Sequence, residues 1–276
     1  MLDRPDPPYS DTSAEALQAR LVDELRRHDG LTIAVSGGID SMTLAYVAHR
    51  FGGRPVRVAH AVSPAVPPLA TERVKTYAAR EGWTLNVIEA GEFADPAYRA
   101  NPVNRCYFCK SHLYDRIREL TDGPIASGAN ADDLGDYRPG LEAAAERGIV
   151  HPFVAAGIDK AGIRAIARHH GLNDISELPA QPCLASRVET GIGIEAGDLA
   201  FIDAMERTLR HDLAATETVR CRLTHAGVVI EVGAGAEAAH AALAATAARL
   251  CSQGGRPFAG VRAYRRGSAF LRSDEA

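Results

Sequence analysis

The string SGGIDS at residues 36–41 places small, hydroxylated and acidic side chains together in one short stretch of the 276-residue chain. Adjacent glycines let backbone N–H groups turn inward with no Cβ in the way. A helix that begins directly behind them adds partial positive charge, and the hydroxyls of Ser36 and Ser41 can donate hydrogen bonds. This combination predicts a cradle for pyrophosphate, in which Asp40 binds Mg²⁺ or caps the helix. The alternative is a tight strand-to-helix turn without a ligand.

A second polar loop occupies residues 127–140, with the sequence SGANADDLGDYRPG. Carboxylates such as Asp132 and Asp133 are oxygen ligands that suit Mg²⁺. Arg138 could clamp a phosphate or carboxylate through two parallel hydrogen bonds, and Gly128 would let the backbone approach a nucleobase. The alternative is an Asn/Asp turn that caps the next helix, which would explain one or two of these residues.

The chain has five cysteines, and an odd number without a secretory signal does not indicate a disulfide framework. Cys106 and Cys109 form a C-x2-C pair, which is typical of metal sites, redox dithiols or coincidence. With Cys183 they provide three thiolates, which suit a [4Fe–4S] cluster with one open iron coordinate. Arg187 follows Cys183 by four residues and would favour its thiolate. The remaining two cysteines are interpreted as structural: Cys221 and Cys251.

Five further side chains could contact ATP, a substrate or a metal. His60 ends a strand at the expected adenine edge, or is a capping or packing histidine. Lys110 follows the C-x2-C pair and could neutralise pyrophosphate, or is a solvated helix-start lysine. Arg220 and Arg222 alternate on one strand, so both project from one face. Glu206 precedes them on a helix and could contact substrate or a metal.

These residues must be positioned by regular elements, and the apolar pattern predicts an α/β arrangement. Short apolar runs predict strands at 31–35, 56–60, 84–89 and 124–128, and helical spacing predicts helices at 14–28, 42–51 and 70–81. The alternation indicates a doubly wound, mostly parallel sheet covered on both faces. Ligands bind beyond the carboxyl ends of such strands, where SGGIDS, His60 and the second polar loop would lie.

The pattern changes after a loop at 174–194, and we expect a smaller α+β domain there. A helix is predicted at 198–213, two strands joined by a turn at 219–232, a helix at 236–251 and a last strand or hairpin at 261–271. We therefore expect three regions: a disordered lead at 1–13, the nucleotide domain at 14–184, and a substrate or oligomerisation domain at 185–276.

The composition is that of an ordinary soluble protein, with 46% hydrophobic and 24% charged residues and a formal net charge of -4. This charge argues against a nucleic-acid partner. No stretch approaches the roughly 18 apolar residues of a membrane span, and the N-terminus lacks the apolar core of a signal peptide. We expect a cytoplasmic protein with no membrane partner.

The string SGGIDS resembles the PP-loop of the ATP-pyrophosphatase superfamily, whose members cleave ATP between the α and β phosphates and transfer AMP to a substrate oxygen. It lacks the Gly-Lys-Ser/Thr of a Walker A loop. SGGIDS, NRCYFCKSHLY, SGANADDLGDYRPG and ELPAQPCLASR, in this order, resemble the LarE family of ATP-dependent sulfur transferases. The three cysteines match a subtype of that family.

The resemblance implies an enzyme of nickel-pincer nucleotide biosynthesis. It would adenylate a carboxylate of pyridinium-3,5-biscarboxylic acid mononucleotide and convert it to a thiocarboxylate. Sulfur would come from a sulfide on a [4Fe–4S] cluster or from a sacrificial Cys183, with zinc at the cysteines as a further alternative. ATP and Mg²⁺ would be cofactors, and the chain would form a homo-oligomer, from a dimer to a hexamer.

The residues that we expect to act fall into three groups. The ATP- and pyrophosphate-binding residues are Ser36, Gly37, Gly38, Asp40, Ser41, His60, Lys110 and Gly128. The substrate-binding residues are Arg138, Arg187, Glu206, Arg220 and Arg222. The catalytic and metal-binding residues are Cys106, Cys109 and Cys183, with Asp40, Asp132 and Asp133 for Mg²⁺.

Three other functions share some of these features. A tRNA thiolase also combines a PP-loop with cysteines, but the acidic charge argues against it. An amidating PP-loop ligase has no need of the three cysteines. A nucleotide-binding subunit without catalysis would show no substrate-dependent pyrophosphate release.

Overall fold

The computed structural model describes residues 12–135, 138–179, 182–211, 218–233, 235 and 239–264. Most of the expected disordered lead at 1–13 lies outside these residues, as do residues 136–137 of the second polar loop. The described chain divides into two compact units, whose segments alternate along the sequence.

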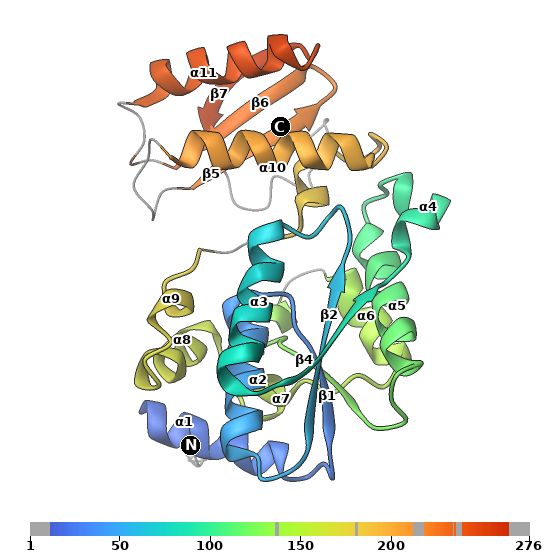
Figure 1. The fold of residues 1–276 in the computed structure, drawn as a ribbon, viewed down its shortest axis with the longest axis vertical. Coiled ribbons are helices and arrows are strands. Elements are labelled where there is room, and N and C mark those ends of the chain that lie inside the picture. The colour runs from blue at the N-terminus through green and yellow to red at the C-terminus, as the bar shows by residue number, and fades with distance from the viewer. Residues whose placement is uncertain are drawn as a thin grey trace, which may run out of the picture. The chain divides into compact units, whose positions relative to one another are not determined.

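The first unit comprises the described residues up to 61 together with 69–89 and 113–178 (Figure 1). Its strands are β1 (Leu31–Ala34), β2 (Val56–Val62), β3 (Thr84–Glu89) and β4 (Ile125–Ser127). Its helices are α1 (Ala14–Leu25), α2 (Ile39–Phe51), α3 (Pro68–Glu81), α6 (Pro139–Glu146), α7 (Pro152–Ala155), α8 (Lys160–His169), α9 (Asn173–Ser176) and the 3₁₀ helix Ala131–Gly135. The helix α5 (Arg105–Arg118) begins in the second unit and ends in the first.

The four strands form one sheet in the order β3-β2-β1-β4, and β1 pairs in parallel with both β2 and β4. Alternate residues of the strands point to two separate cores. Ile33 and Val58 belong to a core built with α1, α2 and α8, whereas Ala34 and Ala59 belong to one built with α5 and α6. The sheet is therefore covered on both faces, and the predicted α/β fold class is confirmed.

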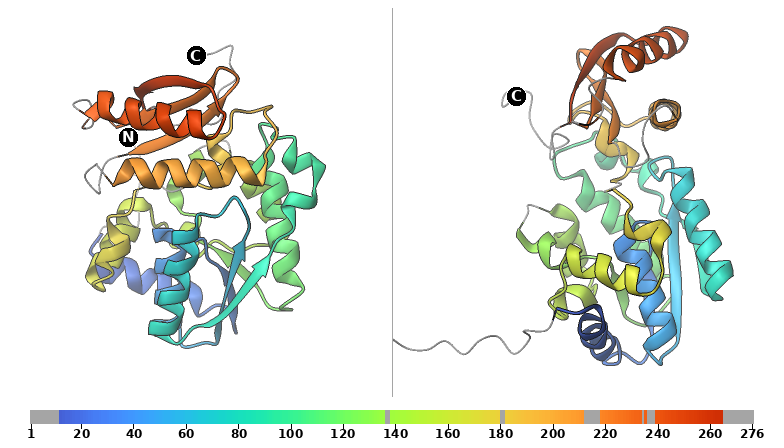
Figure 2. Two further views of the ribbon diagram at one scale, coloured as in Figure 1. Left: turned by 45° about the horizontal axis from the view of Figure 1, so that its top comes forward. Right: turned by 90° about the vertical axis from the view of Figure 1, so that its left-hand side faces the viewer.

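The second unit comprises residues 62–68, 90–112 and the described residues from 179 onward. Its elements are the 3₁₀ helices Glu92–Ala94 and Leu184–Arg187, with α4 (Pro96–Arg99), α10 (Ala196–Arg210), β5 (Val219–Thr224), β6 (Gly227–Val232), α11 (His240–Gln253) and β7 (Phe258–Ala263). β5 and β6 form the predicted antiparallel hairpin, and β7 adds in parallel to β6. The helices α10 and α11 contact each other and pack on this three-stranded sheet (Figure 2).

The last strand begins earlier than predicted, at Phe258 rather than residue 261, and the rest of the predicted 261–271 segment beyond residue 264 lies outside the described residues. No helix in the described ranges combines the length and apolar character needed to cross a bilayer.

We expected one boundary between the domains, at residues 184/185, but the two units do not divide there alone. Two segments that connect elements of the first unit belong to the second unit instead. Residues 62–68 link β2 to α3, and residues 90–112 link β3 to the middle of α5. Their apolar side chains, Ala65 and Tyr98, are buried in the core of the second unit with Leu199 and Val219. The C-x2-C pair therefore belongs to the same unit as Cys183 and not to the unit of the SGGIDS loop.

Candidate functional site

The SGGIDS loop joins β1 to α2 at the carboxyl end of the strand, as predicted. The backbone N–H of Ser36 donates to Ser41 Oγ at 3.0 Å, and the two hydroxyl oxygens lie 3.2 Å apart. Ser36 Oγ accepts from the N–H of Gly38 at 3.3 Å, and Ser41 Oγ donates to the carbonyl of Gly38 at 3.3 Å. The hydroxyls thus hold a closed loop at the N-terminus of α2, where a phosphate group is favoured electrostatically.

Two glycines are required by close backbone contacts around this loop. Gly37 has φ of 80°, and a Cβ there would lie 2.7 Å from the carbonyl oxygen of Ala70. A Cβ at Gly128 would lie 2.6 Å from the backbone nitrogen of Ser41. The chain after β4 therefore packs directly on the first turn of α2. The close approach that the structure shows for Gly128 is to Ser41, and its predicted approach to a nucleobase stays a prediction.

We expect Gly128→Ala to lower the free energy of unfolding by about 2 kcal/mol, because the clash is with backbone atoms that cannot rotate away. It should also weaken ATP binding, since Ser41 N–H must move. Urea denaturation and nucleotide titration measure both effects. Gly197→Ala is the control, since its Cβ would meet nothing within 4 Å. Equal stability of Gly128→Ala and wild type would contradict the packing described above.

Lys160 was not predicted to act, yet its ammonium Nζ lies 2.7 Å and 2.6 Å from the two carboxylate oxygens of Asp40. Asp40 is in the first turn of α2, and Lys160 begins α8, 120 residues later. Burial raises the pKa of Asp40, while Lys160 opposes this rise and Asp133 adds to it. Nothing in the local sequence separates Lys160 from an ordinary helix-start lysine, so only the fold identifies it. The loop therefore carries a cation beside its carboxylate.

The backbone carbonyl of Gly37 in the same loop accepts a hydrogen bond from Arg73 at 2.6 Å. Arg73 lies on α3, where its sequence position also gives no sign of a role at the loop.

The acidic residues of the second polar loop mostly bond to backbone, which the turn alternative predicted. Asp133 accepts from the N–H of Asn130 at 3.1 Å and pairs with Arg138 at 2.9 Å. Asp132 accepts from the N–H of Lys160 at 3.1 Å, and Asn130 accepts from the N–H of Asp132 at 3.1 Å. These contacts give Asp132 and Asp133 structural roles, so the Mg²⁺ role that we predicted for them gains no support.

Mg²⁺ fits this unit through Asp40, since the ion is often bound by one or two carboxylates together with substrate phosphates. The described residues contain no group of three His, Cys, Asp or Glu side chains arranged to hold a single ion. Phosphate oxygens of a nucleotide would supply the missing ligands.

His60 is completely buried, and both ring nitrogens have partners within the first unit. Nδ1 lies 2.9 Å from the carbonyl oxygen of Val35, and Nε2 lies 2.9 Å from Thr71 Oγ1. Burial lowers the pKa of the imidazole. His60 therefore packs inside the unit and contacts Val35, the residue before the SGGIDS loop, as the alternative interpretation predicted. Its predicted contact with adenine stays a prediction.

The three predicted cysteines come together in the second unit. Cys106 and Cys109 lie on the first turns of α5, and Cys183 immediately precedes the 3₁₀ helix Leu184–Arg187. All three are half-buried, and Cys109 and Cys183 pack on the same apolar core. Burial raises the pKa of Cys109 to about 12, with further contributions from Cys183, Glu92 and Cys106. Lys110 opposes this shift, so it lies near the thiols; its predicted contact with pyrophosphate stays a prediction.

These residues fit an iron–sulfur cluster by the chemistry of the donor set. Cys109 and Cys183 come from remote parts of the chain and pack on one apolar core, where thiolates are unfavourable unless a cation compensates them, and Cys106 lies one helical turn before Cys109. Each cysteine of such a cluster would bind a different iron, so the three thiols need not meet at one ion. The thiols Cys221 and Cys251 are fully buried in the core of this unit, as their structural interpretation predicted.

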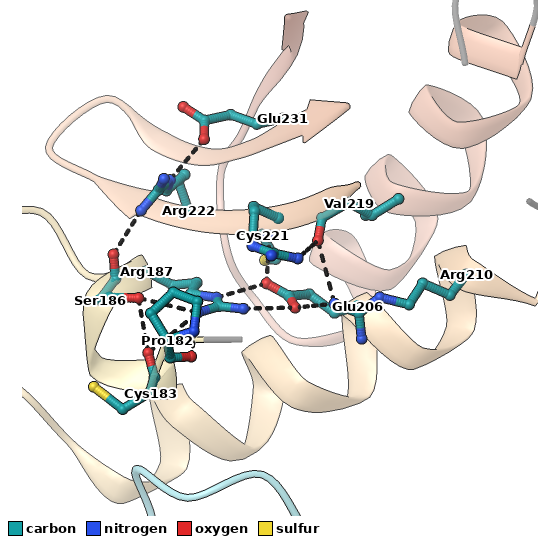
Figure 3. Close-up of polar contacts among 11 residues, drawn as sticks. Pro182, Cys183, Ser186, Arg187, Glu206, Arg210, Val219, Cys221, Arg222 and Glu231 are labelled. Atoms are coloured by element: carbon teal, nitrogen blue, oxygen red, sulfur yellow. Dashed lines mark hydrogen bonds and ion pairs between the residues drawn. The ribbon is translucent and has the colours of Figure 1, made fainter. Parts of the chain in front are cut away.

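Arg187 is buried, and its guanidinium is used entirely within the protein (Figure 3). Nε donates to Glu206 Oε1 at 2.9 Å and NH2 donates to Glu206 Oε2 at 3.2 Å. NH1 donates to the carbonyls of Pro182 at 2.7 Å and Cys183 at 3.2 Å, and to Ser186 Oγ at 3.0 Å. Arg187 was predicted to bind substrate and to favour the Cys183 thiolate. Instead it positions the backbone that carries Cys183.

Glu206 on α10 is the centre of this network. Besides Arg187, it accepts from Arg210 at 2.6 Å and from the backbone N–H of Cys221 at 3.1 Å. Burial raises the pKa of Glu206, but the arginines around it outweigh that effect and lower the pKa overall. Through these bonds Glu206 joins α10 to β5 and to the Cys183 segment, and its predicted contact with substrate or a metal stays a prediction.

Arg220 and Arg222 alternate on β5, as predicted, and both are buried. Arg222 pairs with Glu231 at 2.8 Å and donates to the carbonyl of Ser186 at 2.5 Å. Burial and the positive charges of Arg187 and Arg210 together lower the pKa of Arg220 to about 10. An anion beside Arg220 would relieve this repulsion.

Comparisons with known proteins place these features in context. The chain is 40% identical to the uncharacterized protein slr1717 of Synechocystis, over 66% of this chain and 69% of that protein. It is 28% identical to the uncharacterized protein MJ0830 of Methanocaldococcus jannaschii, over 69% and 73% of the two chains. It is 27% identical to the pyridinium-3,5-bisthiocarboxylic acid mononucleotide synthase of Lactiplantibacillus plantarum, over 70% and 71%.

No protein-family profile matches the chain. The identity to slr1717 over more than two thirds of that protein nevertheless shows common descent. The chain therefore belongs to the family of slr1717.

Proposed function

We propose that this protein is an ATP-dependent sulfur transferase that adenylates a carboxylate of a small nucleotide and converts it to a thiocarboxylate. The observation that carries the proposal is the closed SGGIDS loop. Gly128 packs against its Ser41, Lys160 pairs with its Asp40, and Arg73 donates to the carbonyl of its Gly37. The similarity to the Lactiplantibacillus synthase supports pyridinium-3,5-biscarboxylic acid mononucleotide as the substrate. Nickel-pincer nucleotide biosynthesis is the pathway that this substrate implies.

The first step would use the residues of the loop unit. Backbone N–H groups of residues 37–41 and the hydroxyls of Ser36 and Ser41 would bind the β and γ phosphates of ATP. Lys160 would move from Asp40 to these phosphates, and Asp40 would bind the Mg²⁺ that accompanies them. A substrate carboxylate oxygen attacks the α phosphorus, the bond to the β phosphate oxygen breaks, and pyrophosphate leaves.

The second step would use the cysteine unit. A sulfur nucleophile attacks the acyl carbon, the bond to the AMP oxygen breaks, and a thiocarboxylate forms. Cys106, Cys109 and Cys183 would hold a [4Fe–4S] cluster, which would supply the sulfur; a sacrificial Cys183 is the alternative donor. Arg220 and Arg222 would bind the substrate phosphate, since arginine suits phosphate and the pKa of Arg220 is lowered by burial and by neighbouring positive charge, which an anion would relieve. A homo-oligomer is part of this proposal.

The test begins with iron and acid-labile sulfide assays on anaerobically purified and reconstituted protein. We expect roughly four iron per chain in the wild type, with broad absorption near 400 nm, and loss of both in Cys106→Ala. Cys251→Ala is the matched control, because its thiol is fully buried on α11 and is not one of the three proposed ligands, and it should keep its iron. A colourless, iron-free wild type would overturn the cluster, and loss of one sulfur mass from Cys183 after turnover would indicate the sacrificial donor.

Pyrophosphate release separates the proposal from other classes. Wild-type protein should release pyrophosphate from Mg-ATP only when the biscarboxylic mononucleotide is present. An amidating ligase would remain fully active after Cys183→Ala, whereas the sulfur transferase would still release pyrophosphate but form no thiocarboxylate. Absence of release under all conditions would contradict adenylation.

A further inference from the structure

We propose that Tyr98 is a positioning residue, whose buried hydroxyl donates a hydrogen bond to a sulfur atom bound at Cys109 and Cys183. This inference rests on the proposed sulfur transfer. Tyr98 is 1% exposed, and its hydroxyl has no hydrogen-bond partner in the described part of the chain. Burying a hydroxyl without a partner is unfavourable, so such groups call for a bound acceptor that the polypeptide does not itself provide.

The surroundings of Tyr98 identify the acceptor. Tyr98 lies in the same core on which Cys109 and Cys183 pack, and these two thiols act electrostatically on the phenol. Its ring meets Phe93 edge-on at 5.4 Å between centroids, which fixes its orientation. These contacts make a sulfur atom held by the two cysteines a candidate acceptor for the hydroxyl.

The backbone around Tyr98 is tied to both segments that carry cysteines. Asp95 caps α4 through the N–H of Ala97 at 2.8 Å and pairs with His112 of α5 at 2.9 Å. α5 is the helix of Cys106 and Cys109. The short helix with Tyr98 is thus linked to the C-x2-C pair.

The other link runs through Asn101, which has φ of 53°. Its side-chain nitrogen donates to the carbonyls of Val188 at 3.3 Å, Glu189 at 2.9 Å and Ile192 at 3.0 Å. These carbonyls follow directly on the 3₁₀ helix that Cys183 begins. The position of Tyr98 relative to all three thiols is therefore set by capping and side-chain bonds, as a positioning role requires.

Glu92 is the competing acceptor. It is 3% exposed, one of its carboxylate oxygens, Oε2, has no partner among the described residues, and it also acts on Tyr98 electrostatically. A hydroxyl that served only Glu92 would leave the sulfur unaffected. The experiment must therefore measure a property of the bound sulfur, such as the midpoint potential of the cluster, and not only stability or turnover.

The experiment compares wild type with Tyr98→Phe and Tyr77→Phe in the full-length protein. Tyr77 is equally buried, but its hydroxyl donates to Asp174 at 2.6 Å in the other unit. Before reconstitution, Tyr77→Phe should lower the melting temperature, whereas Tyr98→Phe should not, because it removes an unpartnered hydroxyl. A large loss in Tyr98→Phe would mean that the hydroxyl already has a partner in the polypeptide, which overturns the proposal.

After anaerobic reconstitution, the midpoint potential is measured by a redox titration followed by electron paramagnetic resonance. Hydrogen bonds to sulfur favour the reduced cluster, so we expect a shift to lower potential in Tyr98→Phe and none in Tyr77→Phe. Identical potentials in Tyr98→Phe and wild type would overturn the proposal.

If wild-type protein assembles no cluster after reconstitution, the cluster part of the proposed function fails, and the proposal for Tyr98 fails with it, because no bound sulfur is left to accept from the hydroxyl. A wild-type cluster with identical potentials in Tyr98→Phe and wild type would instead overturn the role of Tyr98 alone and leave the proposed function standing.

Discussion

Arg187→Met should lower the free energy of unfolding by about 3 kcal/mol, because breaking a buried ion pair leaves an uncompensated charge. Both members of the Arg187–Glu206 pair are only 3% exposed. The loss should lie near the low end of the range for buried pairs, because Arg210 still bonds to Glu206. Chemical denaturation followed by circular dichroism measures the change.

The matched control for this variant is Arg207→Ala on the same helix. Arg207 pairs with Asp203 at 3.0 Å, but its side chain is 54% exposed. We expect a change within about 0.5 kcal/mol, as for most exposed pairs. Equal losses in the two variants would show that the Arg187 network does not stabilise the second unit.

The same Arg187 variant should loosen the segment that carries Cys183, since its guanidinium bonds to the carbonyls of Pro182 and Cys183. Cleavage near residue 183 by a protease at low concentration should become faster than in Arg207→Ala. An unchanged cleavage pattern would mean that other contacts hold this segment.

Lys160→Gln should reduce substrate-dependent pyrophosphate release on the order of 100-fold, because the cation that would move from Asp40 to the phosphates would be lost. Stability should change little, since the Asp40–Lys160 pair is partly exposed, with 27% and 33% of the two side chains accessible. Steady-state pyrophosphate assays and thermal melts separate the two effects.

Lys75→Gln is the control for charge alone, because Lys75 is an exposed lysine of α3 in the same unit. It should release pyrophosphate at the wild-type rate. Lys160→Arg should retain part of the activity, since it keeps the charge but changes its geometry. Wild-type activity in Lys160→Gln would remove Lys160 from the proposed step.

The sequence alone predicted the four strands and the helices α1, α2 and α3 of the first unit, because their signals are local, but it did not predict α6, α7, α8 or α9. Buried parallel strands appear as short apolar runs, and β1, β2, β3 and β4 all lie within a residue or two of their predicted ranges. SGGIDS identified the loop between β1 and α2 for the same reason, since a glycine turn and a helix start are encoded by adjacent residues. The hairpin of β5 and β6 was likewise predicted from alternation and a turn.

The tertiary structure decided which residues share a unit and what their side chains contact. The 90–112 connection joins the second unit because Tyr98 and its neighbours bury apolar surface with residues more than 80 positions away. Lys160 reaches Asp40 across 120 residues, and Arg187 takes Glu206 rather than a substrate as its partner. No local pattern encodes such pairings, because an ion pair depends on where two remote side chains lie after the chain has folded.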